Sequence, residues 1–284
     1  MWIRAELKAK AKKVLRHSYW EGVVAYLIFG GISLGVALIG SFLPLGSIAG
    51  TFFVLLPLTV GLNYFYMQNQ VAPPVINNIF FPFNNSRYMK ISGAMAWMYL
   101  FTTLWSMISM IGIFIILVKG FTTFIPFFMD DAFYSNWPNM GGNMLYNNNW
   151  VSDYLRSIDS SWIPALIVSG VIYLAGSILA YIKTLSYSMT PYILTDNPAI
   201  GYERALKLSM AMTDGHKWRM FVLYLSFIGW ALLALLTFGI GFIFLNPYIL
   251  ATRAELYVML RDGAVNSGLT SPEEMNVFPQ QPQQ

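Results

Sequence analysis

Six long apolar runs constrain this chain more than any other feature of its sequence. Each is about 20 residues long, which is the length at which a helix rising 1.5 Å per residue crosses a hydrocarbon core about 30 Å thick. The chain has 284 residues, of which 56% are hydrophobic and only 11% are charged, whereas soluble domains carry about 25% charged residues. The sequence therefore predicts an all-α, polytopic transmembrane helical bundle. We expect spans at about 20–43, 47–67, 93–118, 162–182, 220–238 and 241–260.

Turn residues separate neighbouring spans at two places. Pro44-Leu45-Gly46 predicts a tight helical hairpin between the first two spans. The last two spans could instead form one helix, because residues 220–252 carry no charge. A helix of that length would extend about 50 Å, which is more than the hydrocarbon thickness. Two glycines in the segment from Thr237 to Gly241 lie near the middle of this stretch, and they favour a second hairpin.

The basic residues predict the orientation of the spans. Cytoplasmic segments retain Lys and Arg because these residues resist translocation. With both termini in the cytoplasm, only Lys119 and Arg156 lie outside. The other 15 of the 17 basic residues lie inside: Arg4, Lys8, Lys10, Lys12, Lys13, Arg16, Arg87, Lys90, Lys183, Arg204, Lys207, Lys217, Arg219, Arg253 and Arg261. We therefore expect a multi-pass protein of the plasma membrane with both termini cytoplasmic.

One large segment, at about 119–161, is expected outside the membrane. It mixes acidic, amide and aromatic residues, so it is too apolar for a disordered linker and too polar to cross lipid. We predict a small cap on the outer headgroups, where a protein partner could dock. Its Asp130-Asp131 pair is interpreted as a solvated loop, because a hard cation needs further converging oxygen ligands. Residues 1–262 are expected to form a single transmembrane domain, and residues 263–284 a disordered cytoplasmic tail.

Two amphipathic helices are expected on the inner membrane surface. In the first, Ile3, Leu7, Ala11, Val14 and Leu15 share one face while lysines and arginine occupy the other. This pattern is typical of a helix in the membrane interface, and the cations also serve as topology anchors. The second helix is expected over residues 199–212, after an N-cap at Asn197 and before a stop at Gly215.

Polar residues inside predicted spans define one candidate site. Ionisable groups are costly in a membrane and are candidates for function. Snorkelling near the inner boundary, or a local ion pair, would explain them equally well; of such pairs we favour Arg253 with Glu21. The proline that follows one of the asparagines, Pro247, predicts a kink in the last span. The candidate intramembrane polar site comprises Glu21, Asn63, Asn246, Arg253 and Glu255.

Catalytic chemistry has little support in this sequence. The chain has no cysteine, and its two histidines, His17 and His216, have no second ligand at metal-binding spacing. We therefore expect no enzyme activity, no cofactor and no metal site. The net charge of +4 is too small to indicate nucleic acid as a partner. We expect a protein that contacts the lipid bilayer and binds a lipid, a small hydrophobic ligand or a partner protein. The alternative is a secondary transporter or channel for a small solute.

A series of short motifs in the last third of the chain resembles a known family. Pro191-Tyr192-Ile193-Leu194-Thr195-Asp196 is followed by Ala205-Leu206-Lys207-Leu208-Ser209, Gly215-His216-Lys217, the glycine-containing turn at 237–241, and Pro247-Tyr248. In this order the motifs resemble domain-of-unknown-function family 975, which comprises bacterial integral membrane proteins. The resemblance implies a polytopic bundle in a bacterial plasma membrane, and it implies no catalytic residues. The family is also distantly similar to the membrane domain of some glycerophosphodiester phosphodiesterases.

Overall fold

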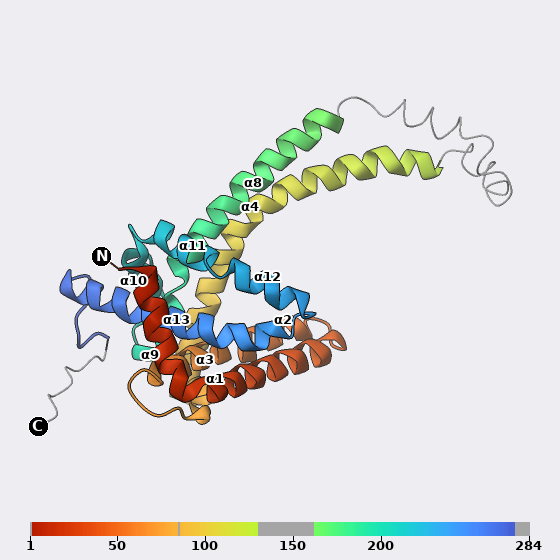
Figure 1. Cartoon of the computed structure of the whole chain (residues 1–284). Helices are drawn as coiled ribbons and strands as arrows, with labels where there is room; N and C mark the ends of the chain where they lie inside the picture. Colours follow the sequence, from red (N-terminus) through yellow and green to blue (C-terminus); the bar gives the residue numbers. More distant parts are fainter. Residues whose placement is uncertain (1, 85, 130–161, 276–284) are drawn as a thin grey trace, which may run out of the picture. The chain divides into compact units, whose positions relative to one another are not determined.

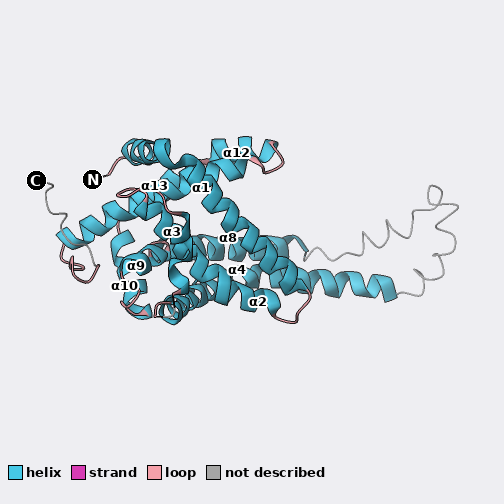
Figure 2. Cartoon of the chain, turned by 90° about the horizontal axis from the view of Figure 1, so that it is seen from below, coloured by secondary structure: helices cyan, strands magenta, loops and turns pink. Residues whose placement is uncertain are grey.

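A computed structural model describes residues 2–84, 86–129 and 162–275 of the chain. Within these ranges every long regular element is a helix, and no strand occurs (Figure 2). Five helical segments of this described part are long and apolar enough to cross a membrane: Arg4–Ser41, Gly46–Gln68, Tyr88–Thr123, Trp162–Asp196 and Lys217–Leu236. The prediction of an all-α membrane bundle is thus confirmed. The chain divides into two compact units that share α4 and α8, where the sequence predicted a single domain: residues 1–101 with 184–284, and residues 102–183.

The first unit contains most of the helices (Figure 1). They are α1 (Arg4–Ser41), α2 (Gly46–Gly50), a π-helical turn (Thr51–Leu55), α3 (Leu56–Gln68), the 3-10 helix η2 (Ile76–Phe83), the start of α4 (Tyr88–Met129), the end of α8 (Trp162–Tyr187), α9 (Thr190–Asp196), α10 (Tyr202–Thr213), α11 (Lys217–Leu225), α12 (Ile228–Leu236) and α13 (Gly241–Asn266).

The first two spans form the predicted hairpin. Leu45, in the turn, has a φ of 62°, a left-handed conformation that reverses the chain between α1 and α2. Small residues let the two helices approach closely, since a Cβ on Gly40 would lie 2.6 Å from the backbone nitrogen of Ser47. This is the small-residue packing that membrane helices use in place of a hydrophobic driving force.

The α13 helix is the central element of the first unit. It contacts α1, α3, α10 and α12, and its Ala254, Leu256 and Tyr257 are fully buried. It corresponds to the sixth predicted span, although it is not among the five candidate spans of the described chain. Three polar residues, Asn246, Arg253 and Glu255, lower its apolar character, and protein rather than lipid covers much of its surface. The helix runs without interruption through Pro247.

The second surface helix, α10, begins at Tyr202 rather than at residue 199 as predicted. The physical reason is that the Asn197 side chain accepts a hydrogen bond from the Ala199 backbone N–H at 2.9 Å, which stabilises a turn instead of a helix start. Gly215 follows the helix with a φ of 70°, as expected for a stop. The apolar face of α10 is buried, including Ala205 and Leu208.

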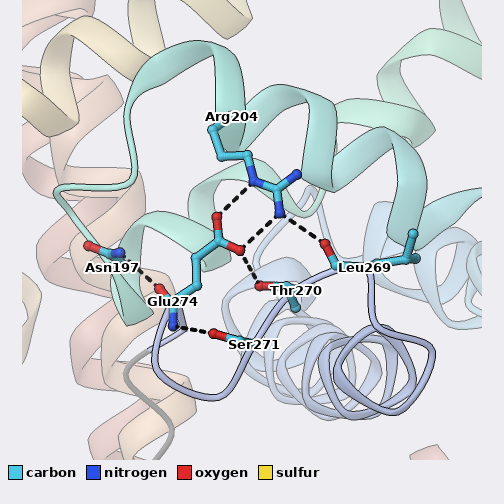
Figure 3. A network of polar contacts seen from close by, with 6 residues as sticks. All are labelled: Asn197, Arg204, Leu269, Thr270, Ser271 and Glu274. Carbon is cyan, nitrogen blue, oxygen red and sulfur yellow. Dashed lines mark hydrogen bonds and ion pairs between the residues drawn. The ribbon is translucent and has the colours of Figure 1, made fainter.

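The tail prediction is wrong for residues 263–275. The α13 helix continues to Asn266, and the segment after it packs onto α10 (Figure 3). Arg204 donates two hydrogen bonds to the Glu274 carboxylate, at 2.7 and 2.9 Å, and a third to the Leu269 carbonyl at 2.9 Å. Met275 is fully buried. Specific polar partners and one apolar anchor thus order a segment whose composition alone suggests disorder.

The second unit is a helical hairpin made of parts of α4 and α8, which run side by side in Figure 1. A Cβ on Gly112 would lie 2.5 Å from the Ser169 carbonyl oxygen, and one on Gly176 would lie 2.6 Å from the Ser109 nitrogen. Residues 119–129, the start of the predicted outer segment, belong to the 42-residue helix α4. The predicted cap itself lies outside the described residues.

Candidate functional site

The basic N-terminal helix packs against protein through its apolar face. Leu7, Ala11 and Leu15 are buried in the core of the first unit, at 4%, 0% and 5% exposure. Residues spaced by four lie on one side of a helix, so these three form a single packed stripe. Ser18 has a non-helical backbone, φ −137° and ψ 23°, where this helix meets the first span. The predicted amphipathic helix is therefore present, and its apolar face contacts the bundle.

Three cations follow this stripe on an adjacent face with the same spacing. Lys8, Lys12 and Arg16 are one helical turn apart from each other. Lys8 donates a hydrogen bond to the Ser226 carbonyl at 3.3 Å, at the break between α11 and α12. The Lys12 ammonium lies 5.7 Å from the ring centre of Tyr248 on α13. We call these three residues the cationic ladder.

A groove of about 790 Å³ opens beside two members of the cationic ladder, Lys12 and Arg16. One wall comes from α1 and the other from the α12–α13 hairpin. Apolar side chains dominate the lining, and several of them are solvent-exposed in the isolated protein, such as Trp230 at 60% and Leu233 at 56%. The groove is lined by Lys12, Leu15, Arg16, Tyr19, Trp230, Leu233, Ala234, Thr237, Gly241, Phe244, Leu245 and Tyr248.

The turn between α12 and α13 builds the far wall of the groove. Phe238 and Gly239 have φ values of 52° and 85°, so the chain reverses there. The Thr237 hydroxyl accepts a hydrogen bond from the Gly241 N–H at 2.8 Å. A Cβ on Gly241 would lie 2.6 Å from the Cα of Ala234, so only glycine permits this close approach. The predicted second hairpin is confirmed, and the alternative of one long helix is excluded.

The groove brings together an apolar slot and a cationic edge. The Tyr19 hydroxyl donates a hydrogen bond to the Phe244 carbonyl at 3.2 Å, which ties α1 to the hairpin along the groove. Cations on an amphipathic helix attract anionic headgroups, and apolar side chains in a groove accommodate acyl chains. The chemistry of the groove therefore suits a molecule with a negative head and a hydrocarbon tail.

The residues of the predicted polar site come from three helices and do not form one ion-paired cluster. Asn63, on α3, is buried at 3% exposure. Asn246 donates a hydrogen bond to the Tyr26 hydroxyl at 2.8 Å, which joins α13 to α1. Glu255 lies in the half of α13 that the sequence predicts to be nearer the cytoplasm, and it interacts electrostatically with Lys10 of the N-terminal helix. Glu21 lies partly buried on α1, a few residues after Ser18.

Arg253 has aromatic neighbours in place of a carboxylate. Its guanidinium carbon lies 6.0 Å from the ring centre of Tyr192 and 5.9 Å from that of Tyr224. Its Nε–H group is shielded from solvent and donates no hydrogen bond to another described residue. The predicted ion pair between Arg253 and Glu21 is wrong, because the described part of the chain has no such pair.

The sequence placed Lys12 and Arg16 on an interfacial helix and favoured a role as topology anchors, and it did not predict the groove. One signal in the sequence could have indicated the groove. The cations Lys8, Lys12 and Arg16 follow the apolar residues of the packed stripe by one position each. They therefore lie on the helix face next to the packed face and not on the opposite one. The aromatic wall, Trp230 and Phe244, had no such signal, since any span carries residues of this kind.

Comparison with known protein families decides the affiliation of the chain. A family model described as "Protein of unknown function (DUF975)" matches residues 1–263. The chain belongs to the DUF975 family. The match to DUF975 extends the resemblance seen in the last third over nearly the whole chain, and it ends just before the segment that packs on α10. No curated protein and no solved structure matches the chain.

Proposed function

We propose that this DUF975 protein is a non-enzymatic membrane protein that binds an anionic phospholipid in the groove between α1 and the α12–α13 hairpin. The observation that carries the proposal is the joint placement of Lys12 and Arg16 beside an apolar groove of about 790 Å³. The cations would contact the phosphate of the headgroup. The exposed aromatic and aliphatic wall would contact the acyl chains.

The distant resemblance to the membrane domain of glycerophosphodiester phosphodiesterases supports the same class of ligand. That domain accompanies enzymes that act on glycerol phosphodiesters, so a chain that is similar to it suits a lipid-binding role. This support comes from the sequence motifs, and it concerns the ligand class rather than any catalytic residue.

We place the protein in a bacterial plasma membrane with both termini cytoplasmic, and we take α13 as the sixth span. Two observations support this arrangement. Basic residues gather in the segments predicted to lie inside. A cleft in the first unit is lined both by Trp2 and Ile3 and by Ser267 and Leu269, so the two ends of the described chain lie together. Single cysteines at positions 85 and 143 test the orientation, because the chain has no other thiol. Labelling of position 85 by an impermeant reagent in intact cells would contradict it.

Native mass spectrometry in detergent tests the lipid proposal. We expect phosphatidylglycerol to bind more tightly than phosphatidylcholine. Each cation near an anionic surface contributes about 1 kcal/mol to binding. Lys12→Gln should therefore weaken the binding of phosphatidylglycerol about fivefold, and Arg16→Gln should have the same effect. Lys13→Gln is the matched control, since it removes one charge from the same helix but does not line the groove.

A second variant tests the apolar half of the groove. Leu233→Trp adds volume to the wall of the groove, so it should weaken the binding of both phosphatidylglycerol and phosphatidylcholine. Equal binding of the two lipids, or equal effects of Lys12→Gln and Lys13→Gln, would overturn the proposal. The transporter alternative predicts instead ion- or proton-coupled flux of a small solute in liposomes, which a lipid-binding protein would not produce.

A further inference from the structure

A second cleft, of about 620 Å³, lies in the first unit and is separate from the groove. Its walls come from the end of α3, from η2, from the start of α4, and from the segment that follows α9. The lining is mostly polar and includes Gln68, Phe81, Ser86, Arg87, Lys90 and Asn197. It shares no lining residue with the groove between α1 and the hairpin.

An aromatic stack orients one of the two cations in this cleft. The guanidinium carbon of Arg87 lies 4.6 Å from the ring centre of Phe81. The Phe81 ring in turn stacks on the Tyr64 ring, with the centres 4.0 Å apart and the planes 23° from parallel. A guanidinium held over a ring loses less conformational freedom when it binds an anion, and its N–H groups remain available as donors.

Neither cation of the cleft is neutralised by a protein carboxylate. Among the described residues, no ion pair involves Arg87 or Lys90. The acidic residue in the lining, Asp196, is already engaged elsewhere. Its Oδ2 accepts hydrogen bonds from the Tyr257 hydroxyl at 2.7 Å and from Arg261 at 3.1 Å. The electrostatic balance of the cleft is therefore positive.

A second part of the cleft lining, at Asn197, is held in place by the segment that follows α13. Asn197 donates a hydrogen bond from its side-chain amide to the Glu274 backbone carbonyl at 2.8 Å (Figure 3). Its side-chain oxygen accepts from the Ala199 N–H. Arg204 fixes Glu274 through its carboxylate. The cleft is thus bounded on both sides by residues whose positions are set before any ligand arrives.

We propose that this cleft binds a phosphate monoester dianion. Arg87 would donate two parallel hydrogen bonds to phosphate oxygens, Lys90 would supply a second positive charge, and Ser86 and Gln68 would add neutral donors. Such a dianion is carried either by a water-soluble phosphate ester or by a phosphatidic acid headgroup. The chemistry that recognises the phosphate is the same for both sources.

The soluble source is tested by the thermal unfolding of the full chain in neutral detergent. Inorganic phosphate is the probe, and sodium chloride at equal ionic strength is the reference. We expect phosphate to raise the unfolding temperature. The double variant Arg87→Gln with Lys90→Gln should abolish this rise. The control pair Lys207→Gln with Lys217→Gln should retain it, because those lysines lie outside the cleft and pair with Glu203 and Asp214.

The lipid source is tested by native mass spectrometry with phosphatidic acid. The Lys12→Gln, Arg16→Gln background is used so that the groove contributes least, which separates this result from the lipid-binding proposal above. If adding Arg87→Gln to this background lowers the affinity for phosphatidic acid at least tenfold, the result supports the lipid headgroup as the source of the phosphate. If the Arg87→Gln, Lys90→Gln variant does not fold, Arg87→Lys replaces it. This substitution keeps the charge but loses the paired donors, so it should weaken the binding of either probe severalfold. The proposal is overturned if neither probe binds in a manner that depends on Arg87 and Lys90.

Discussion

Asn246 of α13 donates a hydrogen bond to the hydroxyl of Tyr26 on α1, over 2.8 Å and 220 positions of sequence. This bond connects the central helix of the first unit to the first span. It also gives one of the predicted intramembrane polar residues a defined structural role. A buried polar group in a membrane protein is stable only with such a partner.

Removing this bond should destabilise the bundle moderately. Asn246→Ala leaves the Tyr26 hydroxyl without its donor, and interhelical hydrogen bonds in membranes contribute about 0.6–1.7 kcal/mol. Unfolding of the detergent-solubilised protein measures the change, and Tyr26→Phe completes a double-mutant cycle. A coupling energy near zero would mean that the two side chains do not stabilise each other.

Arg253 should be coupled to tyrosine and not to Glu21. Its guanidinium lies about equally far from the rings of Tyr192 and Tyr224, and cation–π contacts contribute about 0.5–2 kcal/mol. Arg253→Lys should lower the unfolding free energy by about 0.5–1 kcal/mol, because an ammonium cannot stack as a planar guanidinium does. In double-mutant cycles, Tyr224→Leu should show coupling with Arg253→Lys. Coupling with Glu21→Gln instead would restore the ion-pair hypothesis.

Gly61 should tolerate no side chain. A Cβ at this position would overlap the carbonyl oxygen of Ile79, because η2 crosses α3 at this point. Backbone atoms cannot move aside as a side chain can, so Gly61→Ala should cost about 1–3 kcal/mol or prevent folding. Gly93→Ala is the control. Nothing lies within 4 Å of its added Cβ, and alanine favours a helix, so this variant should be as stable as the natural chain or slightly more stable.

Acid should release the segment that packs on α10. Hydrogen bonds from Arg204, with a further one from Thr270, lower the pKa of Glu274 to about 2 from its usual 4.5. Above pH 4.5 the carboxylate is ionised in both states, so its stabilising contribution is complete. Below that pH the unpaired carboxylate takes up a proton first, and the contribution falls progressively towards pH 2. Because the side chains are 45% and 29% exposed, solvent limits the effect to about 1 kcal/mol or less.

Hydrogen exchange of residues 264–275 between pH 5 and pH 3 measures this release, after correction for the intrinsic exchange rate. Protection should fall with pH in the natural chain. Glu274→Gln should be less protected at pH 5 and should lose the pH dependence. Glu273→Gln should behave as the natural chain does, because Arg204 pairs with Glu274 and not with its neighbour in the described structure. Equal behaviour of the two variants would contradict the assignment.

The sequence by itself determined the features that depend on local chemistry. Apolar length predicts a membrane helix because a buried backbone must satisfy its hydrogen bonds internally. The turns at 44–46 and 237–241 were predictable because glycine and proline limit the backbone directly. The N-terminal amphipathic helix was evident from the spacing of Leu7, Ala11 and Leu15.

Only the tertiary structure decided which polar side chains meet. Arg253 faces Tyr192 and Tyr224 rather than Glu21, although a nearby carboxylate was the natural expectation. Residues 264–275 are ordered because Arg204, 70 positions away from Glu274, reaches them. The groove exists because the turn at Phe238 and Gly239 sets α12 beside α1 as well as α13. Such contacts depend on the relative rotation of packed helices, and a one-residue rotation of about 100° would change every partner while leaving the apolar pattern of the chain unchanged.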